Sequence, residues 1–190
     1  MKTLIISLKI FLFFTVLTGA MYPLFVTGIA QLAFPSKANG SLIKENNKIV
    51  GSELIGQRFD SIIYFSSRPS AISYNPLPSG GTNFGLTNAK LKHSVDSLKN
   101  HFIVFNQLKG NTAIPSEMLF ASASGLDPHI SPGAALLQVE RIAKIRQFDD
   151  SKKQLLLKSI AELSQSPQYM ILGEQRINVL LLNMKLDEIK

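Results

Sequence analysis

The stretch IFLFFTVLTGAMYPLFVTGIAQLAF (Ile10–Phe34) decides the architecture of this chain, because its 25 residues contain no charged side chain. A helix needs about 20 apolar residues to cross a hydrocarbon core of roughly 30 Å. Lys2 and Lys9 precede the stretch, and Pro35 and Lys37 end it. The stretch therefore predicts a transmembrane anchor over residues 10–34.

A cleaved signal peptide is the competing interpretation, with Thr18-Gly19-Ala20 as its cleavage site. The apolar core of a signal peptide normally spans about 7–15 residues, whereas apolar sequence continues here without a break from Met21 to Phe34. We therefore expect a retained anchor that Pro23 kinks. Its small residues, such as Gly19 and Gly28, would let other membrane helices approach closely.

Basic residues mark the cytoplasmic side of a membrane span. Two lysines and the terminal amine precede this span, and three lysines follow it closely, so the count is nearly balanced. The segment before the span, residues 1–9, is short, which favours a cytoplasmic N-terminus. We therefore expect a single-pass protein with residues 37–190 outside the cytoplasm.

The composition disfavours several classes of function. Charged residues make up 17% of the chain, below the roughly 25% of soluble domains, as expected when part of a chain avoids water. The net charge is +7, but the basic residues are scattered, with Lys152-Lys153 as the only adjacent pair. We therefore expect no nucleic-acid partner. The absence of cysteine excludes disulfides, thiolate metal sites and cysteine nucleophiles.

The region after the anchor predicts one α+β (α/β-like) soluble domain with a small sheet. Apolar residues fall on one helical face in Asn88–Leu108. Ser131-Pro132 has the Ser cap and first-turn Pro of a helix start, and residues 150–151 open another helix. Ile62–Phe65 and Ile177–Met184 are β-branched or leucine-rich runs, so we expect both to be strands.

Ser66–Thr87 is a long segment rich in Pro, Gly, Ser and Asn, and long loops of this kind are usually functional or disordered. Its aromatic and aliphatic residues favour an ordered loop. Gly80 and Gly85 have the spacing of a phosphate-binding loop, but Leu86 and Thr87 stand where that loop requires Lys and Ser/Thr. We therefore expect no nucleotide hydrolysis by this chain.

Ser124 and His129, with Asp127 between them, include the residue types of nucleophilic hydrolysis. The members of such triads normally come from separated segments, and Ala121–Gly125 is not the G-x-S-x-G elbow. A membrane-tethered hydrolase that uses Ser124 and His129 is kept as the alternative function. The two other histidines are eight residues apart, not the four of a zinc pair, so we expect no metal site.

Several segments in one order resemble the C subunit of the Kdp-type, high-affinity potassium-transporting ATPase. After the anchor they read GSELIGQRF (Gly51–Phe59), YFSSRPSA (Tyr64–Ala71), SGGTNFGLTN (Ser79–Asn88), SASGLDPHISPGAA (Ser122–Ala135), QVERIAKIR (Gln138–Arg146) and GEQRINVLLLNMKLD (Gly173–Asp187). Such a series at compatible spacing is far more specific than any one motif. The departures are Leu86 for Pro, Phe120 for Thr and Leu181 for Glu, and they remove no residue with a known chemical role.

The resemblance implies a non-catalytic accessory subunit, required for assembly of an ATP-driven potassium uptake complex in the bacterial plasma membrane. It implies two partners, a channel-like subunit that selects potassium and a P-type pump subunit that hydrolyses ATP. The family's C subunit is regarded as raising the ATP affinity of the pump subunit. A domain outside the cytoplasm could do so only by conformational coupling. The resemblance implies that no cofactor binds this chain directly.

The same motifs supply the candidate interface residues. They are Arg68, Pro69, Ser70, Ser79, Gly80, Gly81, Asn83, Gly85, Asn88, Ser124, Gly125, Asp127, Pro128, His129, Ser131 and Asn178. We expect Ser66–Thr87 and Gly125–Ser131 to form a surface that docks on the channel-like subunit near its outer mouth, because Arg and aromatic residues are common interface anchors.

Overall fold

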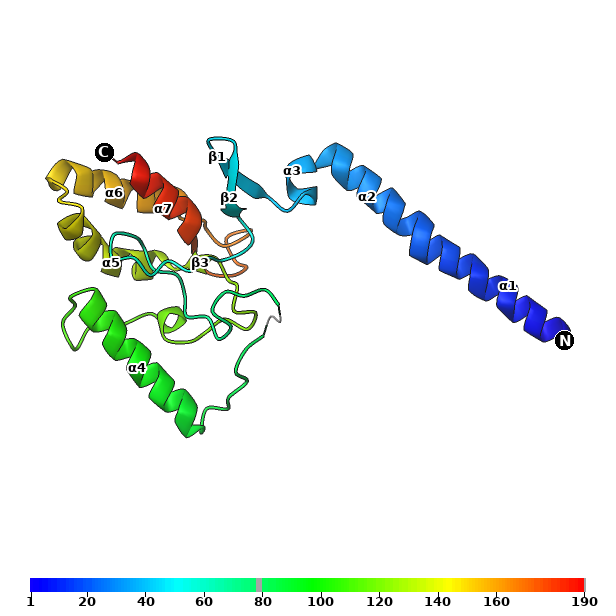
Figure 1. Ribbon diagram of the computed structural model, residues 1–190, viewed down its shortest axis with the longest axis horizontal. Coiled ribbons are helices and arrows are strands. Elements are labelled where there is room, and N and C mark those ends of the chain that lie inside the picture. Colours follow the sequence, from blue (N-terminus) through cyan, green and yellow to red (C-terminus); the bar gives the residue numbers. More distant parts are fainter. Residues whose placement is uncertain (78–79, 190) are drawn as a thin grey trace. The chain divides into compact units, whose positions relative to one another are not determined.

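The structure is a computed structural model that describes residues 1–77 and 80–189. It contains two compact units, Met1–Ser52 and Glu53–Lys190, so the division falls inside the region predicted as the soluble domain. Each unit is described by itself (Figure 1). Ser79, one of the candidate interface residues, lies outside the described residues.

The first unit begins with one uninterrupted helical stretch over Lys2–Ala33. It consists of α1 (Lys2–Val16), the π-helical turn η1 (Leu17–Met21) and α2 (Tyr22–Ala33). The mean hydropathy of its membrane-length window is 2.1, and none of that window is buried within the structure. The stretch is long and apolar enough to cross a membrane, as the sequence predicts.

Pro23 lies at the start of α2, directly after the π-helical turn. A proline ring inside a helix clashes with the carbonyl four residues earlier and donates no backbone hydrogen bond. The wider π turn has the N–H of Tyr22 donating to the C=O of Leu17, which absorbs an extra residue in the helix. The structure thus has a π turn directly before Pro23, and the kink predicted at Pro23 stays a prediction.

A short helix and a hairpin complete the first unit. α3 (Pro35–Ala38) is followed by the antiparallel strands β1 (Leu42–Glu45) and β2 (Lys48–Ser52). Asn46 and Asn47 connect the strands, and both have positive φ, 48° and 63°. This is the backbone that a two-residue hairpin turn requires and that Asn tolerates. This hairpin was not among the elements predicted from the sequence.

The second unit is built mainly from helices. Its elements are α4 (Ala89–Phe105), the 3₁₀ turn η2 (Ser116–Met118), β3 (His129–Ile130), α5 (Pro132–Ile145), α6 (Asp150–Leu163), β4 (Ile177–Asn178) and α7 (Val179–Glu188). β3 and β4 form a two-stranded antiparallel sheet. α6 packs against α5 and α7, and the core includes Ile142, Leu156 and Leu182, each fully buried. The α+β class with small sheets is confirmed.

The predicted helix starts are confirmed with their caps. The side chain of Asn88 accepts the backbone N–H of Lys90 and begins α4. Ser131 accepts the N–H of Ala134 before α5, and Asp149 caps α6. Each cap satisfies one of the unpaired N–H groups of a first helical turn.

The strand predicted over Ile177–Met184 is wrong beyond its first two residues. Ile177 and Asn178 pair with β3, after which the chain enters α7. The side chain of Asn178 accepts the N–H of Leu181 and thereby caps the helix. Val179, Leu182 and Leu186 are then buried at helical spacing, so the leucine-rich run is one face of a buried helix.

The strand predicted at Ile62–Phe65 is also wrong: Ile62 and Ile63 lie in a turn, closed by the N–H of Tyr64 donating to the C=O of Ser61 at 3.1 Å, and this fully described segment pairs with no other strand. Side chains replace the missing strand. The N–H of Phe65 donates to Oδ1 of Asn183 at 2.8 Å, and Nδ2 of Asn183 donates to the C=O of Phe65 at 3.0 Å. Gln138 makes the same double contact with the backbone of Ser66. The two carboxamides satisfy backbone groups that a neighbouring strand would otherwise pair.

Candidate interaction site

Two segments that are far apart in the sequence fold onto each other at the predicted site. Oγ of Ser70 donates to the C=O of Gly125 at 2.7 Å. Gly125 has φ +69°, and a Cβ there would lie 2.5 Å from Cγ1 of Ile72. The position therefore requires glycine both for its left-handed backbone and for space.

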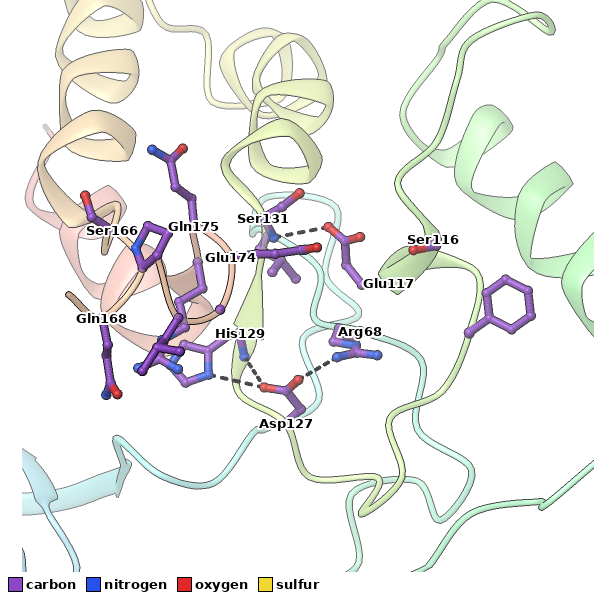
Figure 2. Close-up of a pocket in the computed structure, with 16 residues that line it drawn as sticks. Arg68, Ser116, Glu117, Asp127, His129, Ser131, Ser166, Gln168, Glu174 and Gln175 are labelled. Carbon is purple, nitrogen blue, oxygen red and sulfur yellow. Dashed lines mark hydrogen bonds and ion pairs between the residues drawn. The ribbon is translucent and has the colours of Figure 1, made fainter. Parts of the chain in front are cut away.

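Arg68, Asp127 and His129 form a charged cluster where these segments meet (Figure 2). Nη1 of Arg68 lies 2.6 Å from Oδ2 of Asp127. Oδ1 of Asp127 accepts the backbone N–H of His129 at 3.0 Å and lies 3.2 Å from Nδ1 of its ring. Burial raises the pKa of Asp127, but hydrogen bonds with His129, then the charge and hydrogen bond of Arg68, outweigh it and lower the pKa to about 2. The carboxylate is therefore fixed as an anion at neutral pH.

Both the backbone and the side chain of Arg68 have polar contacts, because Asp127 pairs with its guanidinium. The hydroxyl of Tyr74 donates to the C=O of Arg68, and burial raises the pKa of that hydroxyl. Nε of Arg68 is buried and has no hydrogen-bond partner among the described residues.

A surface cavity of about 780 Å³ opens beside this cluster. It lies between residues 116–131, which include η2 and β3, and the loop 166–176 that leads into β4 (Figure 2). Charges of both signs line it, with Glu117 and Glu174 as well as Asp127, Arg68 and Arg176. Such a lining offers donors and acceptors to a polar partner surface.

The glycine-rich part of the long loop also reaches this region. A Cβ on Gly81 would lie 3.3 Å from the C=O of Ala123, whereas a Cβ on Gly80 or Gly85 would meet nothing within 4 Å. Asn83 has φ 52°. The structure thus brings Gly81 against the segment that carries Ser124 and Gly125.

Other candidate residues have local structural roles. Asn88, Ser131 and Asn178 are helix caps, and Nδ2 of Asn178 also donates to the C=O of Glu53. The C=O of Pro128 accepts the N–H of Val179. Pro69 lines a separate cavity of about 440 Å³ beside α4.

Ser124 and His129 are not arranged as a nucleophile and its base. Oγ of Ser124 accepts the N–H of Leu126 in a local turn, while the His129 ring faces Asp127. Within the described part of the chain, the two side chains share no hydrogen bond and line different cavities. The geometry gives no support to the hydrolase alternative.

Two buried residues of α5 that hold the chain leading into the site were not predicted from the sequence. Arg141 is buried, and its guanidinium donates to the C=O groups of Ile62 and Tyr64 and to Oδ1 of Asn106. Burial lowers the pKa of Arg141 to about 10. Gln138, fully buried on the same face of α5, holds Ser66 at the start of the long loop. Polar residues on the apolar face of α5 were the signal in the sequence.

Comparisons with known proteins agree with this structure. The family described as K+-transporting ATPase, c chain (KdpC), matches residues 4–188. A potassium-transporting ATPase KdpC subunit of Polynucleobacter asymbioticus is 46% identical over 196 residues, covering 98% of this chain and 99% of the relative. The KdpC subunit of Caldanaerobacter subterraneus is 42% identical over 186 residues, covering 97% and 94%, and that of Leptospira interrogans is 45% identical over 182 residues, covering 96% and 92%. The chain, with its apolar N-terminal helix and its α+β unit, therefore belongs to the KdpC family, the c chains of potassium-transporting ATPases.

Proposed function

We propose that this chain is a non-catalytic assembly subunit of the Kdp potassium-transporting ATPase complex. Its Lys2–Ala33 helix anchors it in the bacterial plasma membrane, and its second unit lies on the extracytoplasmic side. There, the described parts of the Ser66–Thr87 loop and the segment Gly125–Ser131 dock together on the channel-like subunit near its outer mouth.

One observation carries this proposal: the two motif-bearing segments form a single fixed surface. The Arg68–Asp127 pair and the Ser70–Gly125 hydrogen bond join them. A surface whose backbone and side chains are already held loses little freedom when a partner binds. The cavity beside it offers charged and polar groups for contacts with that partner.

The charges of the cluster are better suited to contact than to catalysis. Asp127 is held as an anion by His129 and Arg68, so it is a poor general base or acid near neutral pH. Among the described residues, no three acidic or histidine side chains form a group that could hold a metal.

An effect on ATP affinity in the pump subunit would have to be indirect under this proposal. The chain would stabilise one arrangement of its partner subunits, and that arrangement would bind ATP more tightly. The subunit would then act through differential contacts and would not itself touch the nucleotide.

The proposal is tested by replacing Gly81 with leucine in the whole complex. A Cβ at this position already crowds the C=O of Ala123 at 3.3 Å, so the loop must shift away from its support. Gly110→Leu is the matched control, because a Cβ there meets nothing within 4 Å. We expect Gly81→Leu to weaken co-purification of the subunits, with little change in ATP affinity in complexes that still assemble. An intact complex with sharply weakened ATP binding would contradict the proposal.

A further inference from the structure

Four consecutive apolar residues are exposed in the middle of the loop that connects α6 to β4, at its outermost point. The exposed fractions are 86% for Tyr169, 88% for Met170, 81% for Ile171 and 57% for Leu172. Single exposed apolar residues are ordinary on protein surfaces, but a run of three or four indicates a functional contact. We refer to Tyr169–Leu172 as the apolar tip.

The backbone holds this tip in a defined conformation. Gln165 and Arg176 pair at the base of the loop, with N–H to C=O distances of 2.8 and 3.1 Å. The C=O of Gln168 accepts two further backbone N–H groups from the tip. Tyr169 and Met170 have φ of 53° and 66°, a left-handed conformation that L-residues adopt at some cost in free energy. The loop therefore presents its apolar side chains outward from a backbone that has little freedom left to lose on binding.

The tip is continuous with the cavity of the candidate interaction site. Leu172 lines that cavity together with Arg68 and His129, and so does the partly exposed Phe120. Figure 2 shows Gln168 of the loop on one side of the cavity and Arg68 on the other, with the side chain of Glu174 reaching towards Ser131. A partner that covers the Arg68 cluster would thus meet the tip at its edge.

The charge around the tip favours a protein partner over a lipid surface. Residues 164–176 contain one acidic and one basic side chain, Glu174 and Arg176, and no lysine. Segments that lie in a membrane surface typically carry several Lys or Arg residues, which attract anionic headgroups. An apolar end with neutral flanks is instead complementary to an apolar pocket in a protein.

We propose that the apolar tip inserts into an apolar pocket of the channel-like subunit of the same potassium-transporting complex, beside the Ser66–Thr87 and Gly125–Ser131 surface. This inference rests on the proposed function, because it assigns a second anchor point to the same docking. Four side chains are too few for a complete interface, which buries about 800 Å² per partner. The tip therefore acts as a local anchor that strengthens the larger contact.

Photo-crosslinking identifies the occupant directly. Benzoylphenylalanine is placed at position 170 of the full chain, and the assembled complex is irradiated in its native membrane. Position 104 on α4 is the matched control, because Val104 is 76% exposed and distant in sequence from both segments. We expect position 170, and not position 104, to form an adduct with the channel-like subunit. Adducts with a different subunit alone, with lipid alone, with a second copy of this chain alone, or with nothing would overturn the proposal.

Substitution of the tip separates this inference from the proposed function. Met170→Ser with Ile171→Ser leaves the core untouched, and we expect at least about tenfold weaker retention in the complex, a change of about 1.4 kcal/mol in binding free energy. The Val104→Ser control is expected to assemble normally. If Gly81→Leu weakens assembly and the tip variant does not, the tip proposal fails and the proposed function stands. If only the tip variant weakens assembly, the tip proposal stands and the docking role of the Ser66–Thr87 loop fails.

Discussion

Removing the charge of Asp127 tests whether the Arg68–Asp127–His129 cluster holds the docking surface together. Asp127→Asn keeps an oxygen that can accept the N–H of His129, and it removes the negative charge 2.6 Å from Nη1 of Arg68. The substitution therefore isolates the electrostatic part of the cluster. Its matched control is Asp60→Asn, since Asp60 pairs with Arg58 but is 63% exposed.

The magnitude follows from the pKa of Asp127. Folding lowers this pKa from 3.8 to about 2, because the hydrogen bonds and the opposite charge outweigh burial. Each pKa unit corresponds to about 1.4 kcal/mol, so the ionised carboxylate contributes about 2 kcal/mol to the free energy of unfolding. An exposed ion pair such as Arg58–Asp60 contributes about 0–1 kcal/mol.

The sign of the pH dependence is fixed by the lowered pKa. A carboxyl whose pKa is depressed in the folded state contributes fully above its unfolded pKa, and it loses this contribution as the pH falls through its folded pKa. The difference between the original chain and Asp127→Asn should therefore be constant from pH 7 to about 5. It should shrink as the pH falls from about 4 towards 2.

The assay is urea unfolding of the full chain in detergent, followed by the near-ultraviolet circular dichroism of its tyrosines, since the chain has no tryptophan. We expect a loss of about 2 kcal/mol for Asp127→Asn at pH 7 and less than about 1 kcal/mol for Asp60→Asn. Equal losses for the two variants, or a difference for Asp127→Asn that does not change between pH 7 and 3, would refute this reasoning.

Three further predictions concern the support of the site, each measured by the same unfolding assay. Asn183→Leu leaves the buried N–H and C=O of Phe65 unpaired and should lower the free energy of unfolding by about 2–5 kcal/mol. The control Asn100→Leu, on the exposed side of α4, should change it by less than about 0.5 kcal/mol. Similar losses for the two variants would show that the carboxamide of Asn183 does not replace a strand. Gly125→Ala should destabilise by more than about 1 kcal/mol, because its Cβ would overlap Ile72 in a left-handed backbone, and an unchanged or raised stability would contradict that geometry. Ser131→Ala should cost about 1 kcal/mol through loss of the α5 cap, and no measurable cost would show that the cap is replaced by water.

The elements that the sequence predicted correctly are those with local signals. The Lys2–Ala33 helix follows from an unbroken apolar run, α4 follows from helical spacing, and α5 follows from helical spacing with Ser131 as its cap. The sequence predicted that the segments carrying Arg68 and Asp127 form one surface. It could not predict the ion pair itself, because 59 positions separate the two residues in the chain. In each correct case, the residues that determine the structure are neighbours in the sequence.

The incorrect strand predictions have a non-local cause. Ile62–Phe65 contains the β-branched residues of a strand, but it begins with a turn and its partners are side chains of α5 and α7, among them Arg141 and Asn183. No pattern within the segment shows that a helix will supply its hydrogen bonds. Ile177–Met184 is apolar enough for either state, and the cap by Asn178 together with burial on one helical face selected the helix.

The central claim is that the second unit lies outside the cytoplasm and that its long loop is covered by a partner subunit. Leu86 is 94% exposed in the isolated chain, and the chain has no cysteine, so Leu86→Cys gives a unique thiol at this loop. Its reaction with a membrane-impermeant maleimide is measured in spheroplasts, with and without the other subunits, and Val104→Cys serves as the exposed control.

We predict that Leu86→Cys is labelled from outside when the chain is produced alone, and at least about tenfold more slowly in the complete complex, while Val104→Cys is labelled in both. Labelling of Leu86→Cys only after the membrane is opened, or at the same rate with and without the partner subunits, would contradict the account.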